Sequence, residues 1–568
     1  MVAADTQTRP LDVALLPAAG PDSSADLMAA LRAQVPLVAL TPEGPLSQRI
    51  AARSDRPLAL IPADLVLSAV PLGAVLDDPR LGSAALAAPG PEPASWQFLD
   101  VLKIDGPDRA RAAQLAEELE NGADDVPLLE LTRALAAAGV GVTPVPLTGY
   151  VWAHPLDAAE TRSARAGVAA LDERYVRLRE AARGGDGVYS TLVVRRLSWR
   201  LTDLALRLGV TPNQVTVASL LIGLGAALCL AASGTGGRGW AVLGAVLLQL
   251  SLLVDCVDGE LARFRRRFSR FGAWLDASTD RVKEFAVIGA LAFASDRAGH
   301  PVWLLAAVAV VLQTFRNEFE VGWGLQRGYL RGATRPNTWV RNAEPLRFNR
   351  IARPDPGFSW VRRLGHFPVG ERFLLISVAA AVWTPRGTLA LLVAGGALAA
   401  GYMLAAFAVR RRSSSVDAPK LAALFAGGPV LGPALRRATV EATAFAALAP
   451  AVLAVAELVA LWVLVERVDV APEAALALVT ATALAHYLHV YGVRDGAAAV
   501  RRGTGTDGRL LLALVLGVVS TLAPRVATPG TWLLAALVLV EAVVGSLRDW
   551  TDDDSRVTVE TRTVEGAS

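Results

Sequence analysis

The chain has 568 residues, 53% of them hydrophobic, and its mean hydropathy is +0.40. It is too apolar for an ordinary soluble protein and too long for one domain. The net charge of +3 excludes a general nucleic-acid signature, and Cys229 and Cys256 provide neither a disulfide framework nor metal-ligand spacing.

Residues 1–155 are predicted to form a soluble, Rossmann-like α/β domain. The runs "DVALLP", "VPLVAL" and "RPLALIPADLVLS" indicate buried strands, and "LMAALRAQ" has helical spacing. Because strands and helices alternate, we expect a parallel sheet. The N-terminus lacks a basic segment followed by an apolar one, so we expect no cleaved signal peptide and a cytoplasmic domain. Residues 156–185 are charged with helical spacing and predict a connecting helix.

From about residue 214 the chain becomes a series of apolar runs. We find ten, at 215–233, 239–254, 284–294, 302–314, 373–384, 388–409, 442–465, 471–491, 510–523 and 531–546. A spanning helix needs roughly 20 residues, and several runs reach that length only if flanking residues such as Asp276 and Asp280 are helical. We therefore expect an all-α polytopic membrane domain of about ten transmembrane helices, with the acidic residues on helices.

The longest break separates six runs from four. It predicts a six-helix core at 214–410 and a C-terminal four-helix domain at 411–550, to which no motif assigns a role. The polar tail at 551–568 is expected to be disordered.

Arginine placement predicts the orientation of the helices. With the N-terminus inside, the inside segments are 264–272, 315–372, 410–437 and 492–509, and all four are Arg-rich. The outside segments are short and nearly neutral. This positive-inside pattern predicts a multi-pass cell-membrane protein with its N-terminus on the cytoplasmic side.

Four aspartates lie at the edge of the second and third runs, in "LLVDCVDGELARFRRRFSRFGAWLDASTD". Asp255 and Asp258 are three apart, and Asp276 and Asp280 are four apart, so each pair shares a helix face. Two such helices can hold divalent cations, and Mg²⁺ leaves coordination positions for substrate phosphates. A pair of ions can stabilise the attacking and leaving oxygens of a displacement at phosphorus.

Residues between these aspartates suit a phosphate ligand. Gly259 and Gly272 remove side chains where a ligand or backbone approaches closely, and Arg263 offers a planar fork for a diphosphate. The pattern Asp-x-x-Asp-Gly-x-x-Ala-Arg, then eight residues, then Gly-x-x-x-Asp-x-x-x-Asp resembles the CDP-alcohol phosphotransferases (CDP-alcohol phosphatidyltransferases), membrane enzymes with a six-helix core. It is filled at Asp255, Asp258, Gly259, Ala262, Arg263, Gly272, Asp276 and Asp280.

The resemblance covers about 185–410 and implies a reaction. A substituted phosphate would move from a CDP-alcohol to an acceptor hydroxyl with release of CMP, in phospholipid or inositol-phosphate biosynthesis. "GGDGVYSTLVVRRLSWRLTDLALRL" resembles the family's amphipathic helix on the membrane surface, so 156–213 would be a linker with an interfacial helix. The resemblance also allows a homodimer, which the sequence does not establish.

The resemblance implies roles for individual residues. Asp255, Asp258 and Asp276 would hold two Mg²⁺ (or Mn²⁺) ions, with Asp280 at the metal edge. Asp280 would also act as general base toward the acceptor hydroxyl. The residues implied in CDP binding are Asn213, Thr216, Gly259, Ala262, Arg263 and Gly272, with Pro212 near the cytidine.

Four cations are candidates for an acceptor site: Arg281, Lys283, Arg316 and Arg372. Clustered together, they would suit an anionic acceptor such as a phosphorylated polyol. The alternative is that they only anchor the cytoplasmic side of the membrane helices.

The N-terminal domain also resembles a family. "VALLPAAG", "IPADLVLS" and "DPRLGSAALAAPG" are similar to fragments of sugar-phosphate nucleotidyltransferases, with Asp64 at the place of a metal-binding aspartate. After Gly20 the chain lacks the family's further glycine and arginine, so we expect a degenerate, inactive relative. Enzymes that fuse such a domain to this membrane core make CDP-inositol in one domain and use it in the other. Two donors therefore stay open, CDP-diacylglycerol and a CDP-polyol such as CDP-inositol.

Other functions could use the same residues. The carboxylates could line an ion path in a transporter or Mg²⁺ channel, because intramembrane ionisable groups are usually functional. A scaffold with a decayed site is a third reading. His486 and His489 are three apart and could share a metal, but without a third ligand nearby interfacial packing is favoured.

Overall fold

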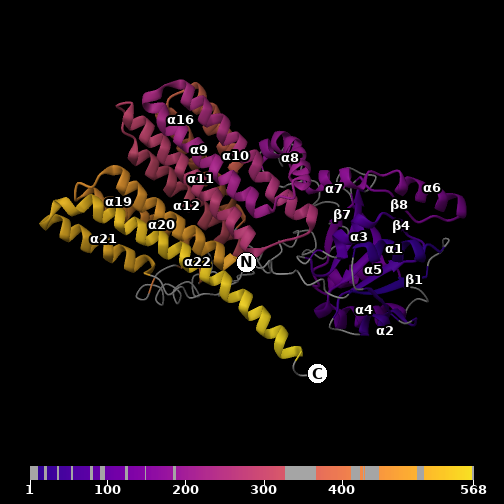
Figure 1. Ribbon diagram of the computed structural model, residues 1–568. Helices are drawn as coiled ribbons and strands as arrows, with labels where there is room; N and C mark the ends of the chain where they lie inside the picture. Colours follow the sequence, from indigo (N-terminus) through magenta and orange to yellow (C-terminus); the bar gives the residue numbers. More distant parts are fainter. Residues whose placement is uncertain are drawn as a thin grey trace. The chain divides into compact units, whose positions relative to one another are not determined.

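The computed structural model describes most of the chain, which divides into two compact units (Figure 1). The described residues are 11–565 apart from 18–21, 35–37, 42, 53–55, 77, 79–80, 90–95, 122–125, 148, 183–186, 327–365, 411–422, 426–427, 429–446 and 495–503. The first unit contains Met1–Ala181, and the second contains nearly all the described residues from Ala182 onward. Gly20, much of the arginine-rich segment 315–372, most of 410–437 and half of 492–509 lie outside the described residues.

The N-terminal unit contains a six-stranded sheet in the order β2-β1-β3-β6-β5-β7. Its strands are β1 (Leu11–Leu16), β2 (Val38–Leu40), β3 (Leu58–Pro62), β5 (Ala84–Pro89), β6 (Trp96–Ile104) and β7 (Thr143–Pro146), and β4 (Val66–Leu67) pairs with β8 (Trp152–Ala153) in a second sheet. β1 is parallel to β2 and β3, and β5 to β7, but β6 is antiparallel to both β3 and β5. The expected all-parallel sheet is therefore wrong. Only residues 90–95 separate β5 from β6, too few for a parallel crossover.

Helices cover both faces of this sheet. Buried side chains of α1 (Ser24–Gln34) and α3 (Ala69–Leu76) share one core with the sheet, and those of α2 (Leu46–Ala51), α4 (Arg109–Glu120) and α5 (Leu128–Ala137) share the other. A short helix, η1 (Gly106–Asp108), precedes α4. Arg109 is fully buried and pairs with Asp12 of β1 at 3.0 Å. This N-terminal α/β layer arrangement matches the sequence prediction.

The predicted connecting helix is two helices, α6 (Ala158–Ala169) and α7 (Glu173–Ala181). The Asp157 side chain accepts hydrogen bonds from the backbone N–H groups of Ala159 and Glu160 and so fixes the start of α6. Leu171 and Asp172 are not helical and separate the two helices.

A short helix η2 (Ser190–Val194) leads into α8 (Arg195–Arg207), whose polar face is inside. Ser198 and Thr202 are buried, whereas Leu197 and Leu204 are about half exposed. The buried Glu260 explains the polar side, because its carboxylate accepts hydrogen bonds from Ser198, from Thr202 at 2.6 Å and from Arg195 at 2.9 Å. An apolar face turned outward is typical of a helix lying on a membrane surface.

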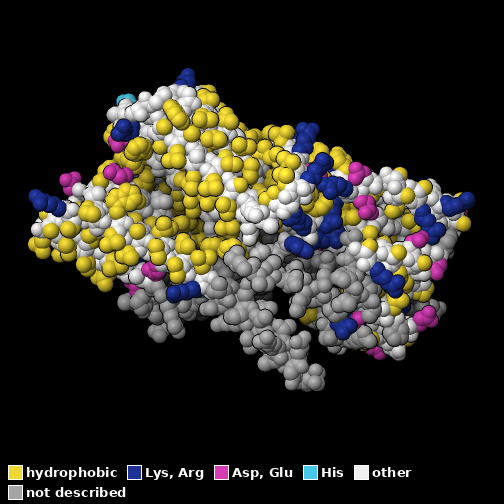
Figure 2. Space-filling model, viewed as in Figure 1, with side chains coloured by type: hydrophobic (Ala, Val, Ile, Leu, Met, Phe, Trp, Pro, Cys, Tyr) yellow, Lys and Arg dark blue, Asp and Glu magenta, His cyan; other side chains and the backbone are white. Residues whose placement is uncertain are grey.

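The rest of this unit is helical. The helices are α9 (Pro212–Gly236), α10 (Arg238–Arg265), α11 (Arg270–Arg297), α12 (Trp303–Gln326), α15 (Val369–Val382), α16 (Pro385–Arg410), α19 (Ala449–Glu466), α20 (Pro472–Arg494), α21 (Gly505–Leu522), η3 (Pro524–Val526) and α22 (Ala527–Glu565). Within the described part of the chain, seven stretches are long and apolar enough to cross a membrane: α9, α10, α16, α19, α20, α21, and η3 with the first part of α22. Hydrophobic side chains cover much of their exposed surface (Figure 2). The protein is therefore a multi-pass membrane protein.

Three predicted runs fall in helices that miss these criteria. α11 and α12 carry several ionisable residues, including Glu284 and Glu318, and α15 has only 14 residues. A count of ten spans therefore stays a prediction. The tail at 551–568 was expected to be disordered, but helix α22 continues to Glu565.

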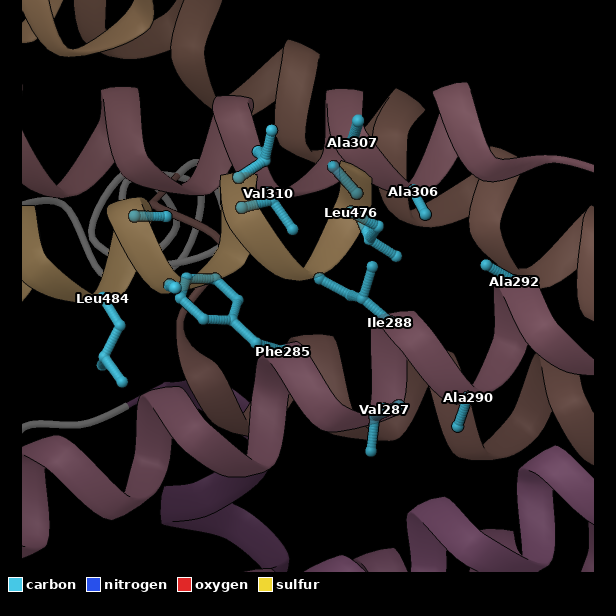
Figure 3. Close-up of a cluster of buried hydrophobic side chains, with 14 of the residues drawn as sticks. Phe285, Val287, Ile288, Ala290, Ala292, Ala306, Ala307, Val310, Leu476 and Leu484 are labelled. Atoms are coloured by element: carbon cyan, nitrogen blue, oxygen red, sulfur yellow. The ribbon is translucent and has the colours of Figure 1, made fainter. Parts of the chain in front are cut away.

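One hydrophobic core joins the predicted six-helix core to the C-terminal helices. It includes Phe285 and Ile288 of α11, Val310 of α12 and Leu476 and Leu484 of α20 (Figure 3). α9 packs against α11, and α12 packs against α16, α19 and α20. The C-terminal helices are thus a continuous part of this unit.

Candidate active site

The start of α9 is fixed by local sequence. Thr211 caps the helix, and its side chain and that of Gln214 form a reciprocal capping box, with Pro212 in the first turn. This well-defined start sets the positions of Asn213 and, one turn on, Thr216.

Three predicted metal ligands converge. Asp255 and Asp258 lie on α10 and Asp276 on α11, and one carboxylate oxygen from each lies within 4.8 Å of the other two. Asp258 is buried, and the other two are half-buried. A donor set made only of carboxylate oxygens fits a hard divalent cation such as Mg²⁺.

Hydroxyl groups of α9 orient two of these carboxylates. Thr216 donates to Asp258 Oδ2 at 2.5 Å, and Ser219 donates to Asp255 Oδ1 at 2.8 Å. Thr216 was predicted to lie near the cytidine. In the structure it is hydrogen-bonded to Asp258, a predicted metal ligand. Ser219 was missed, although its spacing of three from Thr216 puts both on one face of α9.

Asp280 is not one of the three clustered carboxylates, but Lys283 joins it to them. Lys283 Nζ lies 2.9 Å from Asp280 Oδ1 and 2.5 Å from Asp255 Oδ1, and it donates to Ser219 Oγ at 2.8 Å. The lysine is fully buried, and its stem passes over Gly223, where a Cβ would lie 2.8 Å from it. Lys283 was predicted to contact the acceptor, whereas in the structure it is bound to Asp255 and Asp280.

The other residues implied in CDP binding lie at two helix ends. Gly272 is in the first turn of α11, where a Cβ would lie 3.0 Å from Asn213 Oδ1, so the glycine leaves room for the α9 amide. Gly259, Ala262 and Arg263 occupy the last two turns of α10, directly after the two aspartates predicted to bind metal there.

The three predicted arginines gather around one carboxylate, that of Glu284. Arg281 Nη1 lies 2.5 Å from Glu284 Oε2, and Arg372 binds both Glu284 oxygens at 2.6 and 3.1 Å. Arg316 donates to the carbonyl oxygen of Phe367 at 3.1 Å. A pocket here is lined by Glu284, Ile288, Ala309, Leu312, Gln313, Arg316, Phe367, Arg372, Leu392 and Gly396.

Charge at this arginine cluster (Arg281, Arg316, Arg372 and Glu284) is unbalanced. Three guanidinium groups and one carboxylate leave two positive charges among the four side chains, and the nearby carboxylates of Asp280 and Glu320 offset part of them. Sequence reasoning missed Glu284, although a carboxylate at the head of the apolar run 284–294 was a visible signal.

In the N-terminal unit, Asp64 follows β3 and is buried against a histidine. His154 Nδ1 lies 3.0 Å from Asp64 Oδ1, and His154 Nε2 lies 3.9 Å from Asp100 Oδ2. Burial raises the pKa of Asp100, with the nearby Asp64 charge adding to the rise. One oxygen of the aspartate predicted to bind metal is thus occupied by an imidazole.

The two histidines of α20 have different partners. His486 Nε2 lies 2.9 Å from Glu457 Oε2, whereas His489 Nε2 lies 2.9 Å from the carbonyl oxygen of Ala423. The two side chains therefore do not share a partner among these contacts.

Comparison with known proteins locates the match in the helices just described. Residues 209–321 match the family model for CDP-alcohol phosphatidyltransferase. The chain is 36% identical over 140 residues to the bifunctional IPC transferase and DIPP synthase of Thermococcus kodakarensis, covering 24% of this chain and 30% of the relative. It is 32% identical over 164 residues to the protein of that name from Aquifex aeolicus, covering 29% and 34%. It is 41% identical over 91 residues to the phosphatidylinositol phosphate synthase of Corynebacterium glutamicum, covering 16% and 39%. The chain thus spans between 30% and 39% of the length of these three relatives.

Proposed function

Residues 209–321 form a CDP-alcohol phosphatidyltransferase domain, and from this premise we propose that the whole chain transfers a substituted phosphate from a CDP-alcohol to an acceptor hydroxyl. The observation that carries the proposal is the convergence of Asp255, Asp258 and Asp276 beside the separate carboxylate of Asp280. The active site and the N-terminus lie on the cytoplasmic side, an orientation supported by the arginine pattern.

The residues have distinct tasks in this reaction. Asp255, Asp258 and Asp276 would hold two Mg²⁺ ions, and these ions would supply electrostatic stabilisation of the diphosphate. Asp280 takes the proton from the acceptor hydroxyl. The hydroxyl oxygen forms a bond to the phosphorus that carries the alcohol, the bond from that phosphorus to the CMP oxygen breaks, and CMP leaves with the electron pair. Arg263 and Asn213 contribute to binding of the CDP group.

The acceptor is proposed to be an anionic polyol. Support comes from the arginine cluster, because guanidinium groups bind phosphate through charge-assisted hydrogen bonds. Relatives named phosphatidylinositol phosphate synthase make inositol phosphate the first acceptor to test. CDP-diacylglycerol and CDP-inositol both remain candidate donors, and a homodimer remains a proposal from the family resemblance.

The N-terminal domain is proposed to be a degenerate nucleotidyltransferase without activity. The sequence supports this, because after Gly20 the chain lacks the further glycine and the arginine of that family.

CMP release by the purified full chain in lipid with Mg²⁺ tests the function. CDP-diacylglycerol and CDP-inositol are each paired with inositol phosphate and with glycerol phosphate. Release from the lipid donor identifies a phospholipid head-group enzyme, and release from CDP-inositol identifies an inositol-phosphate enzyme. Absence of release in all four pairs, together with cation flux through the same vesicles, would replace this proposal with the transporter reading.

Asp258→Asn is expected to lower metal affinity and CMP release together, the latter by about 10²-fold, because an amide is a weaker ligand for a hard cation than a carboxylate. Mn²⁺ binding measured by electron paramagnetic resonance, beside the rate as a function of Mg²⁺ concentration, checks both effects. Asp296→Asn replaces an exposed carboxylate near the end of α11 and is the matched control. Unchanged Mn²⁺ affinity in Asp258→Asn would remove this residue from the metal site.

A further inference from the structure

Helix α20, outside the family match, packs against the two helices that carry most of the arginine cluster. Leu476 and Leu484 of α20 share a buried cluster with Phe285 and Ile288 of α11 and with Val310 of α12 (Figure 3). The C-terminal helices therefore reach the part of the bundle from which Arg281 and Arg316 project.

Tyr487 of α20 contacts Arg281 of the arginine cluster directly. The guanidinium carbon of Arg281 lies 4.8 Å from the centroid of the Tyr487 ring. A small pocket beside this pair is lined by residues of α11, α12 and α20, among them Gln313 and Asn317. A guanidinium over an aromatic face is stabilised by the ring, most strongly where water is excluded. Tyr487 therefore supports Arg281 from the side of the C-terminal helices.

His486, the residue before Tyr487 on α20, lies close to a carboxylate of α12, the helix that carries Arg316. His486 lies between two carboxylates, with Nε2 at 2.9 Å from Glu457 of α19 and Nδ1 at 3.7 Å from Glu318 of α12. Glu457 is fixed in turn by Arg509 of α21, at 2.5 and 3.1 Å. Glu318 is two residues from Arg316, so this buried network constrains the segment of α12 that lines the pocket containing Glu284, Arg316 and Arg372, here named the acceptor pocket.

The link from Tyr487 to the acceptor pocket runs through Glu284. Its carboxylate is shared by Arg281 and Arg372, and Arg372 lines the pocket. Without the ring, the Arg281 guanidinium would be stabilised mainly by Glu284 and would compete with Arg372 for the same two oxygens. The position of Arg372 therefore depends on how Arg281 is held.

We propose that Tyr487 is a positioning residue that orients the arginine cluster for the phosphate of the acceptor, so that the C-terminal helices help to determine acceptor specificity. This inference rests on the proposed function. It assigns a task to a segment that the family match does not cover.

Tyr487→Leu tests the inference, because it removes the ring and keeps an apolar side chain. The KM for inositol phosphate is expected to rise about three- to thirtyfold, the range for loss of one such contact. The KM for the CDP-alcohol and the rate with unphosphorylated inositol are expected to stay at wild-type values. Tyr487→Phe keeps the ring and removes the hydroxyl, which also interacts with Arg281, so it is expected to raise the KM for inositol phosphate by less than Tyr487→Leu does.

Two comparisons separate positioning from general damage. Leu478→Ala shortens a buried side chain of α20 that does not line the pocket beside Arg281, and it is expected to leave the KM for inositol phosphate unchanged. In an Arg281→Met background, Tyr487→Leu is expected to add nothing, because both changes act through the same guanidinium. Equal effects of Leu478→Ala and Tyr487→Leu, or additive effects in the double variant, would overturn the inference.

Binding of inositol phosphate without donor, measured by isothermal titration calorimetry, keeps the test independent of turnover. Weaker binding in Tyr487→Leu than in wild type supports the inference. Equal binding in the two proteins, or no binding to wild type, overturns it. The proposed function fails separately, if wild type releases no CMP from any donor in the panel.

Discussion

Asp280→Asn is expected to lower kcat for CMP release by about 10²–10⁴-fold, the usual contribution of a general base, while CDP-alcohol binding persists. The side chain is 24% exposed and stands beside the three clustered carboxylates, where an acceptor hydroxyl can reach it. An asparagine has nearly the same shape but cannot take the proton. Lys283 keeps its contacts with Asp255 and Ser219, so the fold is expected to survive.

Rates of CMP release and equilibrium binding of a CDP-alcohol check this result. Asp296→Asn, on the same helix and exposed, controls for loss of a carboxylate in general. Full CMP release by Asp280→Asn would show that another group accepts the proton. Loss of cation flux in a protein that carries out no CMP chemistry would support a transporter instead.

Glu284→Gln is expected to cause the largest loss of stability, about 3–5 kcal/mol in the free energy of unfolding. Glu284 is 2% exposed and is bound by Arg281 and Arg372, which are themselves largely buried. Replacing the carboxylate with an amide leaves both guanidinium groups without their charge partner. The penalty comes from the uncompensated buried charges more than from the lost hydrogen bonds.

Unfolding of the detergent-solubilised protein, followed by circular dichroism across a denaturant series, measures this loss. Glu473→Gln, an exposed position in the first turn of α20, is expected to change the stability by less than about 0.5 kcal/mol. A change of similar size in Glu284→Gln would mean that water reaches the arginine cluster and screens its charges.

Much of the site could be predicted because it depends on local spacing. Asp255 and Asp258 share a face of one helix and Asp276 lies on the next, and the family resemblance implied that the three would hold metal ions together. The link between Asp280 and this group could not be predicted in this way. It depends on Lys283, which contacts Asp280 and also Asp255 on the preceding helix.

Contacts between distant segments were the hardest to foresee. Arg372 and Glu284 are 88 residues apart, and Ser198 and Glu260 are 62 apart, and no periodicity connects such pairs. Strand direction was missed for a related reason, since an apolar run such as β6 has the same pattern in either direction. The α11 and α12 helices show a third limit, because buried ion pairs make their sequences too polar for a simple hydropathy criterion.

Lys283 has a consequence for how the protein assembles. An ammonium group between Asp255 and Asp280, bonded also to Ser219, acts as an internal counter-ion that joins three helices before any divalent cation arrives. Repulsion among the aspartates is then partly offset in the newly inserted chain. Biogenesis in the membrane can therefore precede metal loading, in contrast to small domains whose folding waits for their ion. A chelator should silence this protein without unfolding it.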